Sequence, residues 1–129
     1  MVIDAESTIL ALRALSNPRR LTIMQWLTDP VQHFPPQRDG DLVEDGVCVG
    51  FITKKIELSQ PAVTAHMQVL ADAGLVTSKR IKNWVFYKVD RIRLAAVMAD
   101  LNVAFPDDAS ATGKQARFVG DGSDTGRGE

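Results

Sequence analysis

Hydrophobic residues recur at helical spacing in five parts of this chain of 129 residues. Near the start, Ile9, Leu12 and Leu15 are three residues apart, which predicts a first helix ending before residue 16. Asn17 followed by Pro18 is typical of a helix start, with a capping side chain and a proline at the first helical position, and predicts a second helix to about residue 27. Further helices are expected over 47–56, 59–73 and 91–105.

The fourth of these helices has both ends marked in the sequence. Ser59 can cap its N-terminus, and Gly74 can adopt the left-handed conformation that ends a helix. Val63, Met67 and Leu70 form one apolar stripe, which predicts the face toward the core. A tight turn at residues 57–58 joins this helix to the helix before it.

After Gly74 the apolar period shortens from about 3.6 toward 2. Residues 75–80 and 84–89 are rich in β-branched and aromatic types and flank a polar tip at 82–83, so they predict a β-hairpin. Helix, helix, loop, helix, tight turn, capped helix, hairpin and helix is the order of a winged helix-turn-helix. The predicted fold is therefore mainly α, with about five helices and a two-stranded wing.

Composition places this fold in one domain. The chain is 45% hydrophobic and 24% charged, typical of a globular protein of modest core. We expect the domain to cover residues 1–105, interrupted at 28–46 by a long acidic loop rich in Pro, Asp and Gly. Residues 106–129 are small, polar and glycine-rich, and we expect a disordered tail.

The net charge of −1 conceals an uneven distribution. Residues 47–95 contain eight basic and three acidic residues, whereas 28–46 contain five acids and one base. A basic stretch around a helix-turn-helix favours double-stranded DNA as the partner. The expected phosphate contacts are Lys54, Lys55, Ser59, His66, Lys79, Arg80 and Lys82. For His66 the alternative is a partly buried, structural role that supports the capped helix.

Because the apolar stripe of the capped helix faces the core, its other side is predicted to enter the major groove. Its residues are the expected base readers: Gln60, Pro61, Thr64, Ala65 and Gln68. Gln60 can pair with both N6 and N7 of adenine, and Thr64 and Ala65 can contact a thymine methyl group. The alternative, that these are only solvated polar residues, would hold for an isolated helix without the surrounding bases.

Four short motifs stand out in the chain: Leu-Ser-Asn-Pro-Arg-Arg-Leu at 15–21, Ser-Gln-Pro-Ala-Val-Thr-Ala-His-Met at 59–67, Ala-Gly-Leu-Val at 73–76 and Trp-Val-Phe-Tyr at 84–87. Together, over roughly residues 5–103, they resemble the ArsR/SmtB family of bacterial transcription regulators. The resemblance implies a winged helix-turn-helix repressor with base contacts on the capped helix. Relatives often carry serine and histidine where this chain has Pro61 and Ala65, so their operator cannot be transferred.

The family's usual metal ligands are not expected here. Where many relatives have a Cys-Val-Cys pair, this chain reads Cys48-Val49-Gly50, and its last helix contains no histidine. We expect no metal and no cofactor; any small-molecule effector is unknown. Cys48 is a candidate redox-sensitive thiol, with a small buried apolar residue as the alternative.

The last predicted helix is too apolar for a surface helix and indicates a homodimer built with the first helix. The expected interface residues are Ile9, Leu12, Leu94, Val97, Met98 and Leu101. The sequence thus predicts a cytoplasmic, dimeric repressor reading a pseudo-palindromic operator, with no membrane segment and no enzymatic grouping. The competing classes are a winged-helix protein-interaction module without DNA binding and a thiol-based redox regulator.

Overall fold

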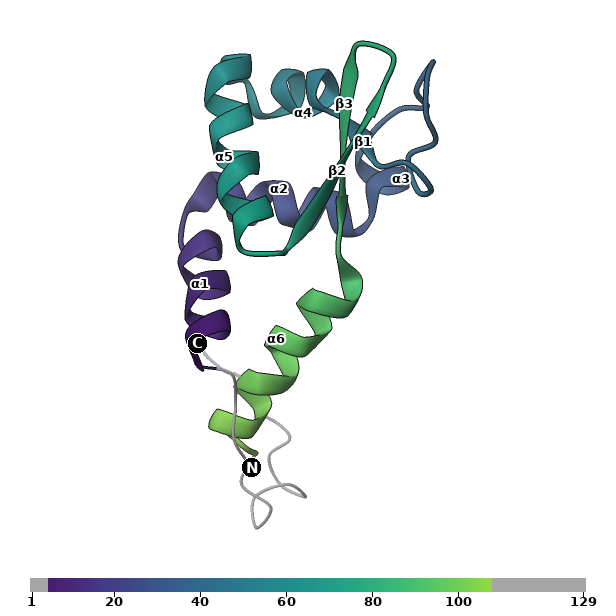
Figure 1. Cartoon of the computed structure of the whole chain (residues 1–129). Helices are drawn as coiled ribbons and strands as arrows, with labels where there is room; N and C mark the ends of the chain where they lie inside the picture. Colours follow the sequence, from purple (N-terminus) through teal and green to yellow (C-terminus); the bar gives the residue numbers. More distant parts are fainter. Residues whose placement is uncertain (1–4, 108–129) are drawn as a thin grey trace, which may run out of the picture.

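The computed structural model describes residues 5–107 and shows a group of helices beside a small sheet, with the last helix extending below it (Figure 1). The helices are α1 Ala5–Leu15, α2 Pro18–Thr28, α3 Pro30–His33, α4 Val49–Ile56, α5 Gln60–Asp72 and α6 Arg91–Ala104. The strands are β1 Val47–Cys48, β2 Val76–Ile81 and β3 Trp84–Val89. The winged helix-turn-helix prediction is confirmed, with two elements more than the sequence indicated: α3 and β1.

The helix starts depend on the caps that the sequence predicted. The Asn17 Oδ1 accepts hydrogen bonds from the backbone N–H groups of Arg19 and Arg20, at 3.0 and 3.1 Å. Ser59 caps α5 by accepting from the Ala62 N–H, and Asp90 caps α6 by accepting from the Arg93 N–H. Each cap satisfies a donor that has no partner within the helix, which fixes where the helix begins.

Two left-handed residues set the direction of α5. Glu57 ends α4 with φ +61° and ψ +45°, and so turns the chain sharply into the Ser59 cap. At the other end Gly74 has φ +77°, and the Leu75 N–H returns to the Leu70 carbonyl at 3.0 Å. This closing hydrogen bond is the pattern expected of a C-terminal glycine, and it leads the chain directly into β2.

The sheet has the order β1-β3-β2 with both pairs antiparallel. One of its faces, which carries Val76, Tyr87 and Val89, packs into the helical core with Ile23, Met67 and other buried side chains. The opposite face, hereafter the back of the wing, carries Lys79, Phe86 and Lys88 among others, because side chains alternate along a strand. Arg80 lies on the core-side face, with Val85 as its cross-strand partner.

The segment 28–46 is more structured than the long loop that the sequence predicted. It contains α3, and its second part, residues 35–46, hereafter the insertion, crosses the back of the wing. There Gly40, at φ +82°, lies so close to the Phe86 ring that an added Cβ would stand 2.9 Å from it, and Phe86 is buried. The prediction of helix from residue 47 was also wrong at its start, since β1 pairs with β3 before α4 begins.

The expected tail at 106–129 lies, apart from its first two residues, outside the described range. Within residues 5–107, none of the helices is long and apolar enough to cross a membrane.

Candidate nucleic-acid interface

One side of α5 is exposed along its length, while the other is the centre of the core. Val63, Met67 and Leu70 are fully buried, as the apolar stripe predicted. The five expected base readers are all exposed: Gln60, Pro61, Thr64, Ala65 and Gln68. The helix therefore presents a polar surface that no other described part of the chain covers.

Gln68 already has a partner within the helix. Its Nε2 donates to the Asp72 Oδ1 at 2.7 Å, one turn further on. Asp72 is exposed and places a negative charge at the C-terminal end of the same surface. Because phosphates repel a carboxylate, the N-terminal half of α5, around Gln60 and Thr64, is the part of this surface best suited to DNA.

His66 lies beside the exposed face and joins α5 to α2. Its Nδ1 is 3.2 Å from Nη1 of Arg20, whose Nε donates to the Ala14 carbonyl at 2.6 Å. A guanidinium can only donate, so Nδ1 is the acceptor and carries no proton. Burial, and then the charges of Arg20 and Arg19, lower the pKa of His66 below its usual 6.5. This contact fits the structural alternative for His66 better than a phosphate contact.

Arg19 and Arg20 are the charged residues near α5 that the sequence reasoning did not assign to the interface. Arg19 is exposed on the first turn of α2 and acts electrostatically on His66. The position of Arg19 beside α5 depends on how α2 packs on α5, and Arg20 and His66, where the two helices meet, are 46 residues apart in the sequence. The only local signal is the Arg-Arg pair that follows Asn17 and Pro18 at the start of α2.

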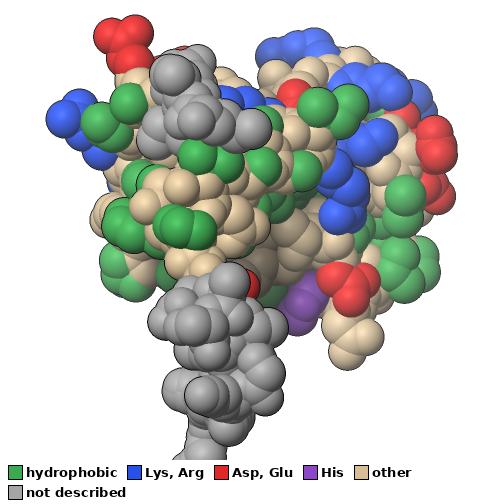
Figure 2. Space-filling view, turned by 90° about the horizontal axis from the view of Figure 1, so that it is seen from below, with side chains coloured by type: hydrophobic (Ala, Val, Ile, Leu, Met, Phe, Trp, Pro, Cys, Tyr) green, Lys and Arg blue, Asp and Glu red, His purple; other side chains and the backbone are tan. Residues whose placement is uncertain are grey.

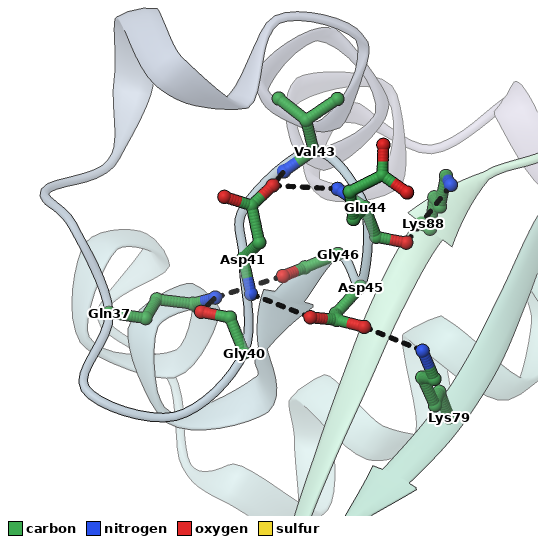
Figure 3. Close-up of polar contacts among 9 residues, drawn as sticks. All are labelled: Gln37, Gly40, Asp41, Val43, Glu44, Asp45, Gly46, Lys79 and Lys88. Carbon is green, nitrogen blue, oxygen red and sulfur yellow. Dashed lines mark hydrogen bonds and ion pairs between the residues drawn. The ribbon is translucent and has the colours of Figure 1, made fainter.

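The insertion holds the lysines of the wing, and Figure 3 shows the contacts of two of them, Lys79 and Lys88. Lys79 Nζ is 2.5 Å from Asp45 Oδ1, and Lys82 Nζ at the hairpin tip is 3.0 Å from Asp39 Oδ1. Lys88 Nζ donates to the Glu44 carbonyl at 3.1 Å. The hydrogen bond from Lys79 holds the pKa of Asp45 below its ordinary value. Two of the expected phosphate contacts thus already have carboxylate partners.

The insertion holds its own shape through Asp41 and Gln37. Asp41 Oδ2 accepts from the backbone N–H groups of Val43 and Glu44, at 3.0 and 2.8 Å, and so closes a turn. Gln37 donates to the Gly46 carbonyl at 3.0 Å and accepts from the Cys48 N–H at 2.7 Å. The acidic segment is therefore fastened to β1 as well as to the wing lysines.

The remaining expected phosphate contacts differ in their freedom. Lys55 lies over the Trp26 ring, with Nζ 5.0 Å from its centroid, so its side chain is directed toward α2. The side chains of Lys54 and Arg80 are exposed and form no hydrogen bond or ion pair with any residue in the range 5–107. Ser59 is exposed, although its hydroxyl oxygen accepts the capping hydrogen bond. Among the expected phosphate contacts, Lys54 and Arg80 are thus the most free to meet a phosphate.

The outer sides of α1 and α6 expose hydrophobic side chains on the face seen from below (Figure 2). Of the expected interface residues, Ile9, Leu12 and Met98 are exposed, while Leu94 and Leu101 are half-buried. Val97 is a correction: it is 1% exposed and belongs to the core, so it cannot contact a second copy. Ile92 on α6 and Phe105, directly after the end of α6, are more exposed than any residue assigned to the interface.

The helices of this face are joined within one chain by polar contacts. The Thr8 hydroxyl donates to Asp100 at 2.6 Å, and Arg93 donates to the Ser7 carbonyl at 2.8 Å. They fix α6 against α1.

Cys48, the candidate redox thiol, is half-buried in β1. Among residues 5–107, no three His, Cys, Asp or Glu side chains gather as a metal site would require.

A helix-turn-helix with an exposed α5, a hairpin wing and flanking basic residues defines a winged-helix transcription regulator. The comparisons with known proteins agree. The chain is 41% identical over 78 residues to the HTH-type transcriptional regulator YbzH of Bacillus subtilis. The matched region covers 60% of this chain and 78% of YbzH. It is 27% identical over 108 residues to the nodulation protein NolR of Rhizobium meliloti, covering 84% and 76% of the two chains. No protein-family model matches.

Solved structures share the fold. An ArsR-family transcriptional regulator superposes with a TM-score of 0.61 at 17% identity, over 81% of this chain and 92% of that one. HlyU from Vibrio cholerae gives 0.54 at 23% identity, over 83% and 100%. The homodimeric DNA-binding domain of Mb0332 from Mycobacterium bovis gives 0.54 at 19%, over 78% and 81%. The chain belongs to the ArsR/SmtB family of winged helix-turn-helix transcription regulators. The relatives that it matches are transcription regulators, not enzymes.

Proposed function

We propose that the chain is a homodimeric repressor that reads a pseudo-palindromic site in double-stranded DNA. The observation that carries the proposal is the uncovered face of α5, with Gln60 and Thr64 exposed at its capped N-terminal half. In the reading mode of this fold, such a face enters the major groove and its side chains contact base edges. Arg80 on the wing and Lys54 on α4 would neutralise phosphates on either side.

The dimer would form through α1 and α6. Their outer surface exposes Ile9, Leu12 and Met98, and apolar surface of this extent on a small domain favours a partner. A related fold, that of Mb0332, is described as homodimeric. A two-fold axis between the copies would place the two α5 helices about 34–36 Å apart, one turn of duplex DNA. Occlusion of a promoter by such a dimer is the simplest route to repression.

The test is selection of bound fragments from the host genome, followed by gel shift at increasing salt. A DNA regulator would enrich sites with inverted symmetry, and its affinity would fall steeply as salt displaces the protein from phosphates. Transcription from a promoter containing the selected site should decrease when the protein is added. Binding that shows no sequence preference and no salt dependence would favour the competing class, a protein-interaction module.

A further inference from the structure

The insertion, the back of the wing and the first turn of α4 line an open pocket of about 310 Å³, hereafter the insertion pocket. Small-molecule sites in proteins occupy about 300–1,000 Å³ and are mostly apolar, with few polar groups. Phe51, Trp84 and Phe86 give this pocket three aromatic walls, and Gly50 of α4 leaves one side without a side chain. In size and lining it has the character of a site for one small aromatic molecule.

Trp84 marks the pocket as incompletely filled. Phe86, two residues along β3 and on the same face, is 1% exposed beneath the insertion, whereas Trp84 remains 49% exposed. Large aromatic side chains contribute strongly to binding when a partner ring covers them. The indole therefore offers apolar surface that the chain itself does not cover.

The polar groups around the pocket leave one charge uncompensated. Gln37 is fully engaged by the Gly46 carbonyl and the Cys48 N–H, and Asp39 is paired with Lys82 at 3.0 Å. Arg38 also lines the pocket, is exposed, and has no hydrogen bond or ion pair with any described residue. A guanidinium presents a planar fork of donors that matches a carboxylate.

We propose that the insertion pocket binds a small planar aromatic carboxylate. Its ring would lie against Trp84 and Phe51, and its carboxylate would pair with Arg38. Asp39 does not oppose such an anion, because Lys82 balances its charge. Neither a metal nor the Cys48 thiol is needed for this binding.

The pocket is connected to the tip of the wing. Asp39 lines it and also holds Lys82, so an anion bound beside Arg38 adds negative charge next to the hairpin tip. Bound ligand would therefore weaken the affinity for DNA, and this consequence rests on the proposed function. An aromatic acid would act as an inducer of a repressor.

Binding can be measured on the full chain by quenching of Trp84. The chain has two tryptophans, so Trp26→Phe leaves Trp84 as the only indole. The probe is 4-nitrobenzoate, a quencher on contact, and 4-nitrobenzyl alcohol is its neutral counterpart. We expect saturable quenching by the acid, about two- to fivefold tighter than by the alcohol, because only the acid can pair with Arg38 and that side chain is exposed to solvent. Arg38→Gln should remove this preference, and Arg13→Gln, on the exposed side of α1, should not.

A second variant fills the pocket without changing charge. An added Cβ at Gly50 meets only Cys48 Sγ, at 3.9 Å, and leucine favours a helix more than glycine does. Gly50→Leu should therefore abolish saturable quenching without lowering the melting temperature. Equal, unsaturated quenching by both probes, or tight binding that survives Arg38→Gln and Gly50→Leu, would overturn the pocket assignment.

The assay contains no DNA, so its failure leaves the proposed function intact. A chain that binds 4-nitrobenzoate but no DNA would instead overturn the proposed function alone. Where both ligands bind, the acid should weaken DNA binding in the parent chain and leave it unchanged in Gly50→Leu. No effect on DNA binding by the parent chain would overturn the connection to the wing.

Discussion

The Arg20 guanidinium donates to Nδ1 of His66 across 3.2 Å and so fastens the helix that presents the candidate reading face to the helix behind it. This hydrogen bond exists only while Nδ1 is unprotonated. The lowered pKa of His66 has the same origin, burial followed by the positive charges of Arg20 and Arg19. The attachment of α5 is therefore sensitive to acid.

We predict that the chain loses stability as the pH falls from 7.5 to 5.5. The unfolded chain takes up a proton at His66 near pH 6.5, while the folded chain resists it, so stability is complete above that pH and is lost toward the folded pKa. His66→Gln keeps an acceptor but does not titrate. Urea unfolding at both pH values should show a smaller loss in the free energy of unfolding for the variant than for the parent chain. His33 is present in both chains, so it does not contribute to this difference. An equal loss would show that His66 does not cause it.

Gln60→Ala is predicted to weaken binding to the selected site and to relax its sequence preference. A paired contact between a glutamine and adenine discriminates by about 1–3 kcal/mol, and Gln60 is exposed on the capped turn of α5. Gel shift against the selected site and single-base variants of it would measure both effects. Gln25→Ala, exposed on α2, removes the same side chain away from α5 and should change neither. Unaltered preference in Gln60→Ala would remove this residue from the reading face.

Asp45→Asn should strengthen binding to all DNA sequences alike. The carboxylate of Asp45 holds Lys79 at 2.5 Å, and removing its charge frees that lysine for a phosphate. Each additional phosphate contact makes the slope of log affinity against log salt steeper by about 0.9. Adding Lys79→Gln to Asp45→Asn should restore the original slope. Glu6→Gln, on α1, changes the net charge equally and should have little effect; an unchanged slope in Asp45→Asn would contradict the prediction.

The pair of Asp45 and Lys79 illustrates what the sequence could predict and what it could not. Helix ends with a capping residue were predictable because each depends on a local contact, as with Asn17 and the N–H groups of Arg19 and Arg20. The acid in Asp45 and the base in Lys79 were visible, but their pairing spans 34 residues. Composition alone therefore described residues 28–46 as a long acidic loop, although the insertion covers Phe86 and holds the lysines of the wing.

The candidate interfaces show the same division. The period of apolar residues in α5 separated its buried from its exposed side correctly, since burial there follows helix geometry. In α6 the period could not distinguish an apolar residue facing its own core from one facing a second copy. Val97 is the former, and Met98, its neighbour, is exposed. The contacts of α6 with α1, such as Thr8 with Asp100, decide the matter and span 92 residues.

Met98→Asp is predicted to convert the dimer to a monomer and to weaken binding to a symmetric site. Met98 is 53% exposed on α6, so the charge costs little in one chain but is repelled from an apolar interface. Sedimentation velocity would give the mass, and gel shift the affinity. Val31→Asp is the control, because Val31 is 65% exposed on α3, outside the proposed interface. This variant gains the same charge and should remain a dimer. A parent chain that is monomeric at all concentrations, or a Met98→Asp chain that still dimerises, would place the dimer contact elsewhere or rule it out.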